Sequence, residues 1–294
     1  MFNSRPHFHT SILSFALVAL TFTACAAPAT TPPTPTAIVS GPDAISVGVA
    51  SNDFGVGTPR IPFVMFQGAH PIADATMVMV TAFDLSSGTA TPTWSGAATG
   101  YSDYDLPYWV VYPEMKVAGR WGLVAALTRA DGRQAEAQFV VTISDTVSAP
   151  DIGEAPPASQ NRTLTTEPDI AKLTSDPVPE LGLYQLTVAE ALQSGQPTIV
   201  TFATPAFCTS RLCAPVVDSI KAVYTDWKDS ANFIHIEVYK DFGPPLVFAD
   251  EMAEWHLLSE PWTYVLDAEG RVVARLGGPV SPAELREVLT LVVK

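Results

Sequence analysis

Two cysteines in the C-terminal half of this 294-residue chain, Cys208 and Cys213, have the residue type and spacing that could carry out chemistry. Four residues separate them in the stretch TFATPAFCTSRLCAPVVD (201–218), which follows an apolar β-like run and precedes a helical pattern. A thiol pair at such a junction can exchange disulfides, bind a soft metal ion or form a structural disulfide. The elements that position the pair are needed to choose among these three chemistries.

The four-residue spacing predicts an irregular loop between the cysteines. On a regular helix, residues five apart lie ~7.5 Å apart along the axis and are rotated by ~140°, which separates their Cα atoms by about 9 Å. A disulfide bridges at most ~7 Å between Cα atoms. Pro215 disfavours helical geometry at Ala214 and suits the first turn of a helix. We therefore expect a loop that carries Cys208, and a helix that begins between Cys213 and Val216.

The elements around the pair alternate between strand and helix patterns. Thr187 and Glu190 fit a helix capping box, and apolar residues recur at helical spacing from Val216 to Trp227. Strands are expected at 197–203, 233–238, 262–266 and 271–276, and further helices at 248–258 and 282–293. The order after the first helix is strand, helix, strand, helix, strand, strand, helix.

This order resembles the thioredoxin fold over residues 181–294, with the cysteine pair at the first strand-to-helix junction and Glu260-Pro261 before the hairpin. The resemblance implies that Pro261 is a cis-proline facing the cysteines. The family motif has two residues between its cysteines, whereas this chain has four. The family also carries a buried Asp six residues before the first cysteine, where this chain has Phe202.

The resemblance implies a thiol–disulfide oxidoreductase that needs no cofactor and no metal. Cys208 follows the strand end, where nearby helix amides and Arg211 would favour its thiolate, so it is expected to be the nucleophile. Cys213 lies further into the helix and is expected to be the resolving thiol.

Three alternatives remain open. The first is a non-catalytic binding module with a structural disulfide. The second is a peroxiredoxin-like peroxidase, since Thr204-Pro205 lies just before the pair and Arg275 or Arg211 could stand beside the thiolate. The third is a copper-binding assembly factor in which His235 or His256 adds a nitrogen ligand.

The first 25 residues predict export. A short basic start with Arg5 is followed by an apolar stretch, 12–22, that is short for a membrane span. The sequence FTAC at 22–25 resembles the bacterial lipoprotein signal, which implies lipidation at Cys25 after cleavage. Residues 26–40 are rich in Pro and Thr and are expected to form a tether.

Residues 41–145 show β patterns throughout. Strict alternation at 134–143 and turn signals between short strands favour an immunoglobulin-like β-sandwich. Met77 and Met79, two apart in one strand, are expected on its buried face. Residues 146–180, rich in Pro, Ser, Thr and acidic residues, are expected to be a linker to the thioredoxin-like domain at 181–294. The predicted fold class is multidomain, an all-β sandwich followed by an α/β domain.

Charge limits the possible partners. The formal net charge is −14 and the chain has no basic run, which argues against a nucleic-acid partner. After Cys25 is lipidated, two cysteines remain in an oxidising compartment. The expected partners are protein thiols and disulfides in the cell envelope, and the membrane through the N-terminal lipid. The expected location is the outer face of the bacterial cytoplasmic membrane or the cell envelope.

Overall fold

The computed structural model describes residues 44–86 and 91–293. These residues belong to one compact unit, Val39–Lys294. The predicted signal peptide, Cys25 and the predicted tether lie outside the described residues. No helix in the described part of the chain is long and apolar enough to cross a membrane.

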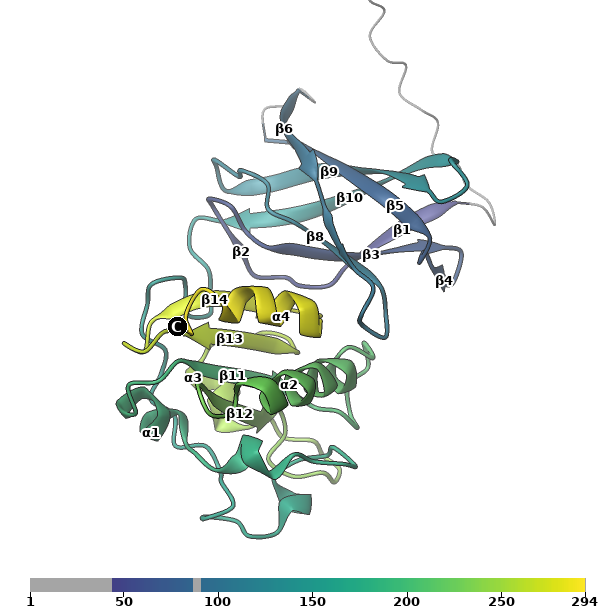
Figure 1. Ribbon diagram of the computed structural model, residues 1–294. Coiled ribbons are helices and arrows are strands. Elements are labelled where there is room, and N and C mark those ends of the chain that lie inside the picture. The colour runs from purple at the N-terminus through teal and green to yellow at the C-terminus, as the bar shows by residue number, and fades with distance from the viewer. Residues whose placement is uncertain (1–43, 87–90, 294) are drawn as a thin grey trace, which may run out of the picture. The chain divides into compact units, whose positions relative to one another are not determined.

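The N-terminal region is a β-sandwich, as predicted (Figure 1). The first sheet has the order β1-β3-β8-β7, with β4 paired to β3. Its strands are β1 (Ile45–Val49), β3 (Ile61–Gln67), β4 (His70–Pro71), β7 (Thr99–Tyr101) and β8 (Tyr108–Val111). The second sheet has the order β2-β10-β9-β5-β6. Its strands are β2 (Phe54–Gly55), β5 (Ala75–Asp84), β6 (Pro92–Ala97), β9 (Gly119–Arg129) and β10 (Gln134–Ser144).

Residues that alternate in sequence form the sandwich core. On β10, Phe139, Val141 and Ile143 are buried, whereas the residues between them face outward. They pack in one cluster with residues of the opposite sheet such as Phe63. The expectation for Met77 and Met79 is wrong, because Val78 and its alternate neighbours on β5 fill the core and the methionines are exposed.

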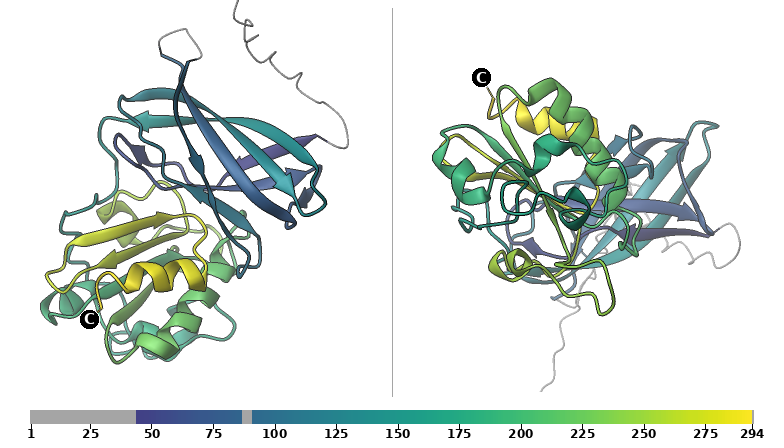
Figure 2. Two further views of the ribbon diagram at one scale, coloured as in Figure 1. Left: turned by 45° about the horizontal axis from the view of Figure 1, so that its top comes forward. Right: turned by 90° about the horizontal axis from the view of Figure 1, so that it is seen from below.

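The C-terminal region is a four-stranded sheet with helices on both faces (Figure 2). The strand order is β12-β11-β13-β14, in which β11 is parallel to β12 and antiparallel to β13. The strands are β11 (Thr198–Ala203), β12 (Asn232–Glu237), β13 (Trp262–Leu266) and β14 (Val272–Gly277). The helices are α1 (Val188–Gln193), α2 (Cys213–Trp227), α3 (Asp250–Glu254) and α4 (Pro282–Leu289), with short 3-10 turns at Ile170–Lys172 and Leu181–Tyr184. This is a thioredoxin-like fold, as the element order predicted.

Successive side chains of β11 point to opposite faces of the sheet and pack in two different hydrophobic cores. Ile199 faces α2 and α4, whereas Val200 and Phe202 face α1 and α3. Every residue of β11 is buried, because both faces of this central strand are covered. The strand is therefore a rigid support for the loop that follows it.

Helix α3 is shorter than the predicted 248–258. Phe248 forms an isolated β-bridge with Tyr239, so the chain is still extended at the expected helix start. At the other end, His256 has a φ of 52°, a left-handed conformation that ends the helix. The helix itself covers Asp250–Glu254.

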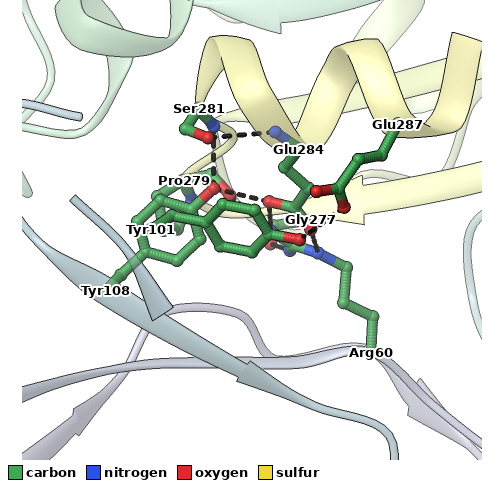
Figure 3. Close-up of polar contacts among 8 residues, drawn as sticks. All are labelled: Arg60, Tyr101, Tyr108, Gly277, Pro279, Ser281, Glu284 and Glu287. Atoms are coloured by element: carbon green, nitrogen blue, oxygen red, sulfur yellow. Dashed lines mark hydrogen bonds and ion pairs between the residues drawn. The ribbon is translucent and has the colours of Figure 1, made fainter. Parts of the chain in front are cut away.

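The sandwich and the α/β region share a buried polar contact (Figure 3). Arg60, just before β3, donates from Nε to Glu284 Oε1 of α4 at 2.6 Å. Tyr108 of β8 donates its hydroxyl to the other oxygen of Glu284 at 2.5 Å. The side chains of Arg60 and Glu284 are 5% and 2% exposed. The ion pair therefore fixes β3 and β8 against the start of α4.

Candidate functional site

The cysteine pair lies where β11 gives way to α2. Strand β11 ends at Ala203, and the loop that follows begins with a turn in which the Cys208 amide donates to the Thr204 carbonyl at 3.2 Å. Cys208 is partly exposed, whereas Cys213 at the start of α2 is 0% exposed. Both cysteines are free thiols. The predicted loop and the predicted helix start at Cys213 are thus confirmed.

Helix α2 begins without a side-chain cap. Leu212 is the N-cap residue, and its carbonyl accepts the first helical hydrogen bond, from Val216, at 3.1 Å. Pro215 occupies the first turn, where its missing amide proton is not needed. Because the first amides of the helix lack partners within it, they are available to groups in the loop.

The residues before β13 form the opposite side of the site. Strand β13 runs antiparallel to β11, with Thr263 opposite Thr201 and Trp262 opposite Phe202. The chain that enters β13 therefore passes beside the end of β11. The Glu260–Pro261 peptide bond there is cis. The sulfur atoms of Cys208 and Cys213 and a carboxylate oxygen of Glu260 all lie within 4.8 Å of one another.

The Cys208 sulfur is surrounded by hydrogen-bond donors. The Cys213 thiol, the Ser210 hydroxyl and the backbone amides of Cys213 and Leu212 together lower the pKa of Cys208 to about 5, against the opposing effect of burial. The Ser210 hydroxyl lies 3.0 Å from the sulfur. A thiol with this pKa is almost wholly ionised at neutral pH, so Cys208 is a thiolate there.

The pKa values of Cys213 and Glu260 are shifted in the opposite direction, upward. Donation of its proton to Cys208, together with burial, raises the pKa of Cys213 far above that of an ordinary thiol. Burial and the negative charge of Cys208 raise the pKa of Glu260. The site therefore contains one thiolate, one protonated thiol and one carboxyl group whose proton affinity is increased.

Arg211 lies on the loop but is exposed and has a φ of 62°. Its predicted contribution to the Cys208 thiolate stays a prediction. The Arg275 guanidinium pairs with Asp53 at 2.5 Å and lies over the Trp262 ring at 5.2 Å. The residues that the structure places around the sulfur are thus polar groups of the loop and of the Glu260 segment.

The two histidines weighed as metal ligands are placed elsewhere. His235 is buried, and its Nε2 donates to the Ala203 carbonyl at 3.1 Å, so Nδ1 accepts from the Tyr184 hydroxyl at 2.7 Å. Both ring nitrogens are used, and burial lowers the pKa of His235, which keeps the ring neutral. His256 is exposed at the end of α3. His235 therefore holds the end of β11 in place.

The two thiols and Glu260 form a group of His, Cys, Asp and Glu side chains, within the described residues, that is close enough together to hold a metal ion. Two sulfurs and one oxygen would select a soft or borderline cation. The unequal proton affinities of the three groups match those that an exchange reaction requires.

Three residues of the site were not singled out from the sequence. Glu260 enters the sequence prediction only as the neighbour of Pro261, although an acidic residue directly before that proline could have indicated a carboxyl group in the site. Ser210, between the cysteines, was another. Tyr104 gave no local signal: its hydroxyl donates to the Leu212 carbonyl at 2.7 Å, although the two residues are 108 positions apart in the chain.

An open pocket of about 880 Å³ adjoins Glu260. Its lining includes Phe248, Met252, His256 and Leu258. Phe248 stacks on Tyr239 with 5.2 Å between ring centroids, and Phe207 of the cysteine loop meets Tyr239 edge-on at 6.1 Å. Exposed apolar groups therefore border the partly exposed thiol.

Comparison with known proteins gives distant structural likeness. A thiol:disulfide interchange protein of the thioredoxin family from Chlorobium tepidum TLS is 15% identical, with a TM-score of 0.35 over 50% of this chain and 100% of that chain. StoA from Bacillus subtilis is 20% identical, with a TM-score of 0.28 over 32% of this chain and 83% of its own. CopC from Methylosinus trichosporium OB3b is 13% identical, with a TM-score of 0.24 over 32% and 85%. No family model and no curated protein matches the chain.

Proposed function

We propose that the chain is a thiol–disulfide oxidoreductase of the bacterial envelope, in which Cys208 is the nucleophile and Cys213 the resolving thiol. One observation carries the proposal: a partly exposed free thiol, Cys208, and a buried free thiol, Cys213, have their sulfur atoms within 4.8 Å of each other and of a Glu260 carboxylate oxygen. Thiol–disulfide exchange needs such a pair, because one sulfur must attack while the other stays protonated until the mixed disulfide forms.

In the reductive direction the Cys208 thiolate attacks one sulfur of a substrate disulfide. The substrate S–S bond breaks, a mixed disulfide forms, and the departing substrate thiolate takes a proton from solvent. Once Cys208 is no longer an anion, it no longer holds the Cys213 proton, and burial and the charge of Glu260 are the remaining effects that oppose ionisation of Cys213.

Glu260 is the base for the second step. Its carboxylate accepts the proton of Cys213, and the new thiolate attacks the Cys208 sulfur. The mixed disulfide breaks and releases the second substrate thiolate, so two electrons have passed from the dithiol to the substrate. The enzyme is left with a Cys208–Cys213 disulfide, and a second dithiol protein must reduce it. The oxidative direction is the reverse of these steps.

The partners proposed are protein thiols and disulfides of the envelope. The pocket beside Glu260, and the rings of Phe207 and Tyr239 on the cysteine loop and after β12, supply apolar surface near the site. Lipidation at Cys25, as the FTAC sequence at 22–25 suggests, would keep the chain at the membrane surface.

Trapping of mixed disulfides tests the proposal. Cys213→Ser removes the resolving sulfur, so Cys208 should stay joined to substrate proteins in non-reducing gels of the producing cells. Cys208→Ser should give no such adducts, because the remaining thiol is buried and protonated. Equal and slow alkylation of both thiols by iodoacetamide in the native protein, with no adducts in either variant, would instead favour an inert pair.

A further inference from the structure

We propose that Tyr104 of the β-sandwich is a positioning residue of the redox site and acts on Cys208 through the Leu212–Cys213 peptide. The inference rests on the proposed function and gives the sandwich a part in it. Tyr104 lies between β7 and β8 and is 6% exposed. Its hydroxyl donates to the Leu212 carbonyl oxygen at 2.7 Å.

The contact falls on a chemically significant peptide group. The Leu212 carbonyl and the Cys213 amide belong to the same peptide unit, and that amide is one of the groups that lower the pKa of Cys208. A hydrogen bond accepted by the oxygen of a peptide polarises the group and strengthens its N–H as a donor. The hydroxyl of Tyr104 thus lies at one end of a relay that ends at the Cys208 sulfur.

The hydrogen bond from Tyr104 also restrains the position of the Leu212–Cys213 peptide. Leu212 is the N-cap of α2 and has no side-chain cap, so nothing on the helix itself restrains this peptide beyond the Val216 amide. Tyr104 supplies a second donor to the same oxygen from outside the helix. The first amides of α2 are thereby held toward the cysteine loop.

Tyr104 is itself held by the contact between the two regions. Its ring meets Tyr108 edge-on, with 5.3 Å between centroids. Tyr108 donates to Glu284 and accepts from the Ser281 amide at 2.7 Å, and Arg60 neutralises Glu284 (Figure 3). This buried network therefore positions the Tyr104 hydroxyl against the Leu212 carbonyl.

The titratable groups that face Cys208 come from four parts of the chain. They are Cys213 on α2, Glu260 before β13, Tyr239 after β12 and Tyr104 of the sandwich. Burial and then the charge of the two thiols raise the pKa of Tyr104, so its hydroxyl stays protonated and remains a donor.

The experiment compares Tyr104→Phe with Tyr101→Phe in the purified full-length protein. Each variant loses one hydroxyl from the same segment, but the Tyr101 hydroxyl donates to Glu287 of α4 at 3.1 Å and not to the loop. The rate of Cys208 alkylation by iodoacetamide is measured from pH 4 to pH 8 by mass spectrometry. Cys213 reports on folding, because it stays protected only while it is buried.

In Tyr104→Phe, the midpoint of the rate profile should move to higher pH while Cys213 stays protected. A midpoint displaced upward by one unit would lower the rate at pH 5 about fivefold and leave the rate at pH 8 unchanged. Tyr101→Phe should keep the parent profile. If both variants keep it, or both move it equally, Tyr104 does not position the site. If the parent protein itself shows an ordinary thiol midpoint, the proposed function fails first, which separates the two outcomes.

Discussion

Two thiols of the same chemical type behave differently here because of what surrounds each sulfur. Cys208 receives hydrogen bonds from a thiol, a hydroxyl and two backbone amides, and each of these favours the anion. Cys213 is enclosed by apolar residues such as Val217 and Ala203, and its proton is shared with Cys208. The environments of the two thiols thus match the proposed roles of Cys208 as nucleophile and Cys213 as resolving thiol.

Glu260 gives the sharpest prediction at the residue scale. Glu260→Gln keeps the size of the side chain but cannot accept a proton from Cys213. Turnover in the reduction of a disulfide peptide should fall about 100-fold, in the usual range for loss of a general base. Alkylation of Cys208 at pH 7 should stay within about twofold of the parent, because Cys208 is already a thiolate with a pKa of about 5.

Glu251→Gln is the matched control for this experiment. Glu251 lies on α3, and burial also raises its pKa, but it is not part of the group formed by Glu260 and the two thiols. Its substitution should leave turnover unchanged. Normal turnover in Glu260→Gln would show that another group, or water, accepts the Cys213 proton.

At the scale of elements, the ion pair between Arg60, just before β3, and Glu284 in the first turn of α4 is expected to have a large effect on stability. Arg60→Met would leave Glu284 buried without its cation, and such a loss costs about 3–5 kcal/mol. Urea unfolding of Arg60→Met and of the parent protein measures this loss of stability. Arg286→Met removes an exposed partner of Asp226, with side chains 43% and 52% exposed, and should cost less than about 1 kcal/mol.

The double substitution Arg60→Met with Glu284→Leu completes this test. It removes the buried charge as well as its partner, so it should recover part of the stability lost in Arg60→Met. Similar losses in Arg60→Met and Arg286→Met would show that the buried pair does not hold the two regions together.

Sequence patterns predicted helices and strands well where apolar residues recur with a single clear period along the whole segment. The alternation at 134–143 corresponds to β10, and the helical spacing after Pro215 corresponds to α2. Strand β6 carries no strong strand pattern in the sequence, because it is a sheet edge with Pro92, Gly96 and mostly exposed small residues. Period-two alternation also does not reveal which face is buried, and this explains the error at Met77 and Met79.

Only part of the candidate site could be predicted from the sequence. The cysteines and Pro261 carry local motifs, so their approach could be expected from the order of elements. The position of Glu260 depends on the pairing of β13 with β11, and Tyr104 depends on the docking of the sandwich. Both are tertiary relations between distant segments, which local patterns do not encode.

At the scale of the whole molecule, the two regions share one apolar core as well as the Arg60–Glu284 pair. Tyr101, Tyr104 and Tyr108 of the sandwich pack in the same cluster as Leu212, Val216 and Leu285 of the α/β region. The start of α2, which carries Cys213, therefore packs beside residues of the sandwich. The predicted domain boundaries at 41–145, 146–180 and 181–294 stay predictions.

The segment predicted as a linker, 146–180, also packs on the α/β region. The Asn161 side chain accepts from the Val188 amide at the start of α1 at 2.8 Å, and both the amide and the hydroxyl of Ser175 donate to Glu237 of β12. Buried polar groups are usually paired in this way. We infer that this stretch stabilises the α/β region as well as connecting it to the sandwich.

The location of the whole molecule rests on Cys25, which lies outside the described residues. If Cys25 carries a lipid, Cys25→Ser should move the protein from the membrane fraction to the soluble envelope fraction or leave it unprocessed, because a side chain without acyl groups has little affinity for the bilayer. Mass spectrometry of the N-terminus measures the modification directly. Cys208→Ser, which changes the same residue type in the proposed redox site, should stay with the membrane. An unchanged N-terminal mass and an unchanged distribution in Cys25→Ser would contradict the anchor, and the proposed exchange reaction at Cys208 would then have to be placed in the envelope by other means.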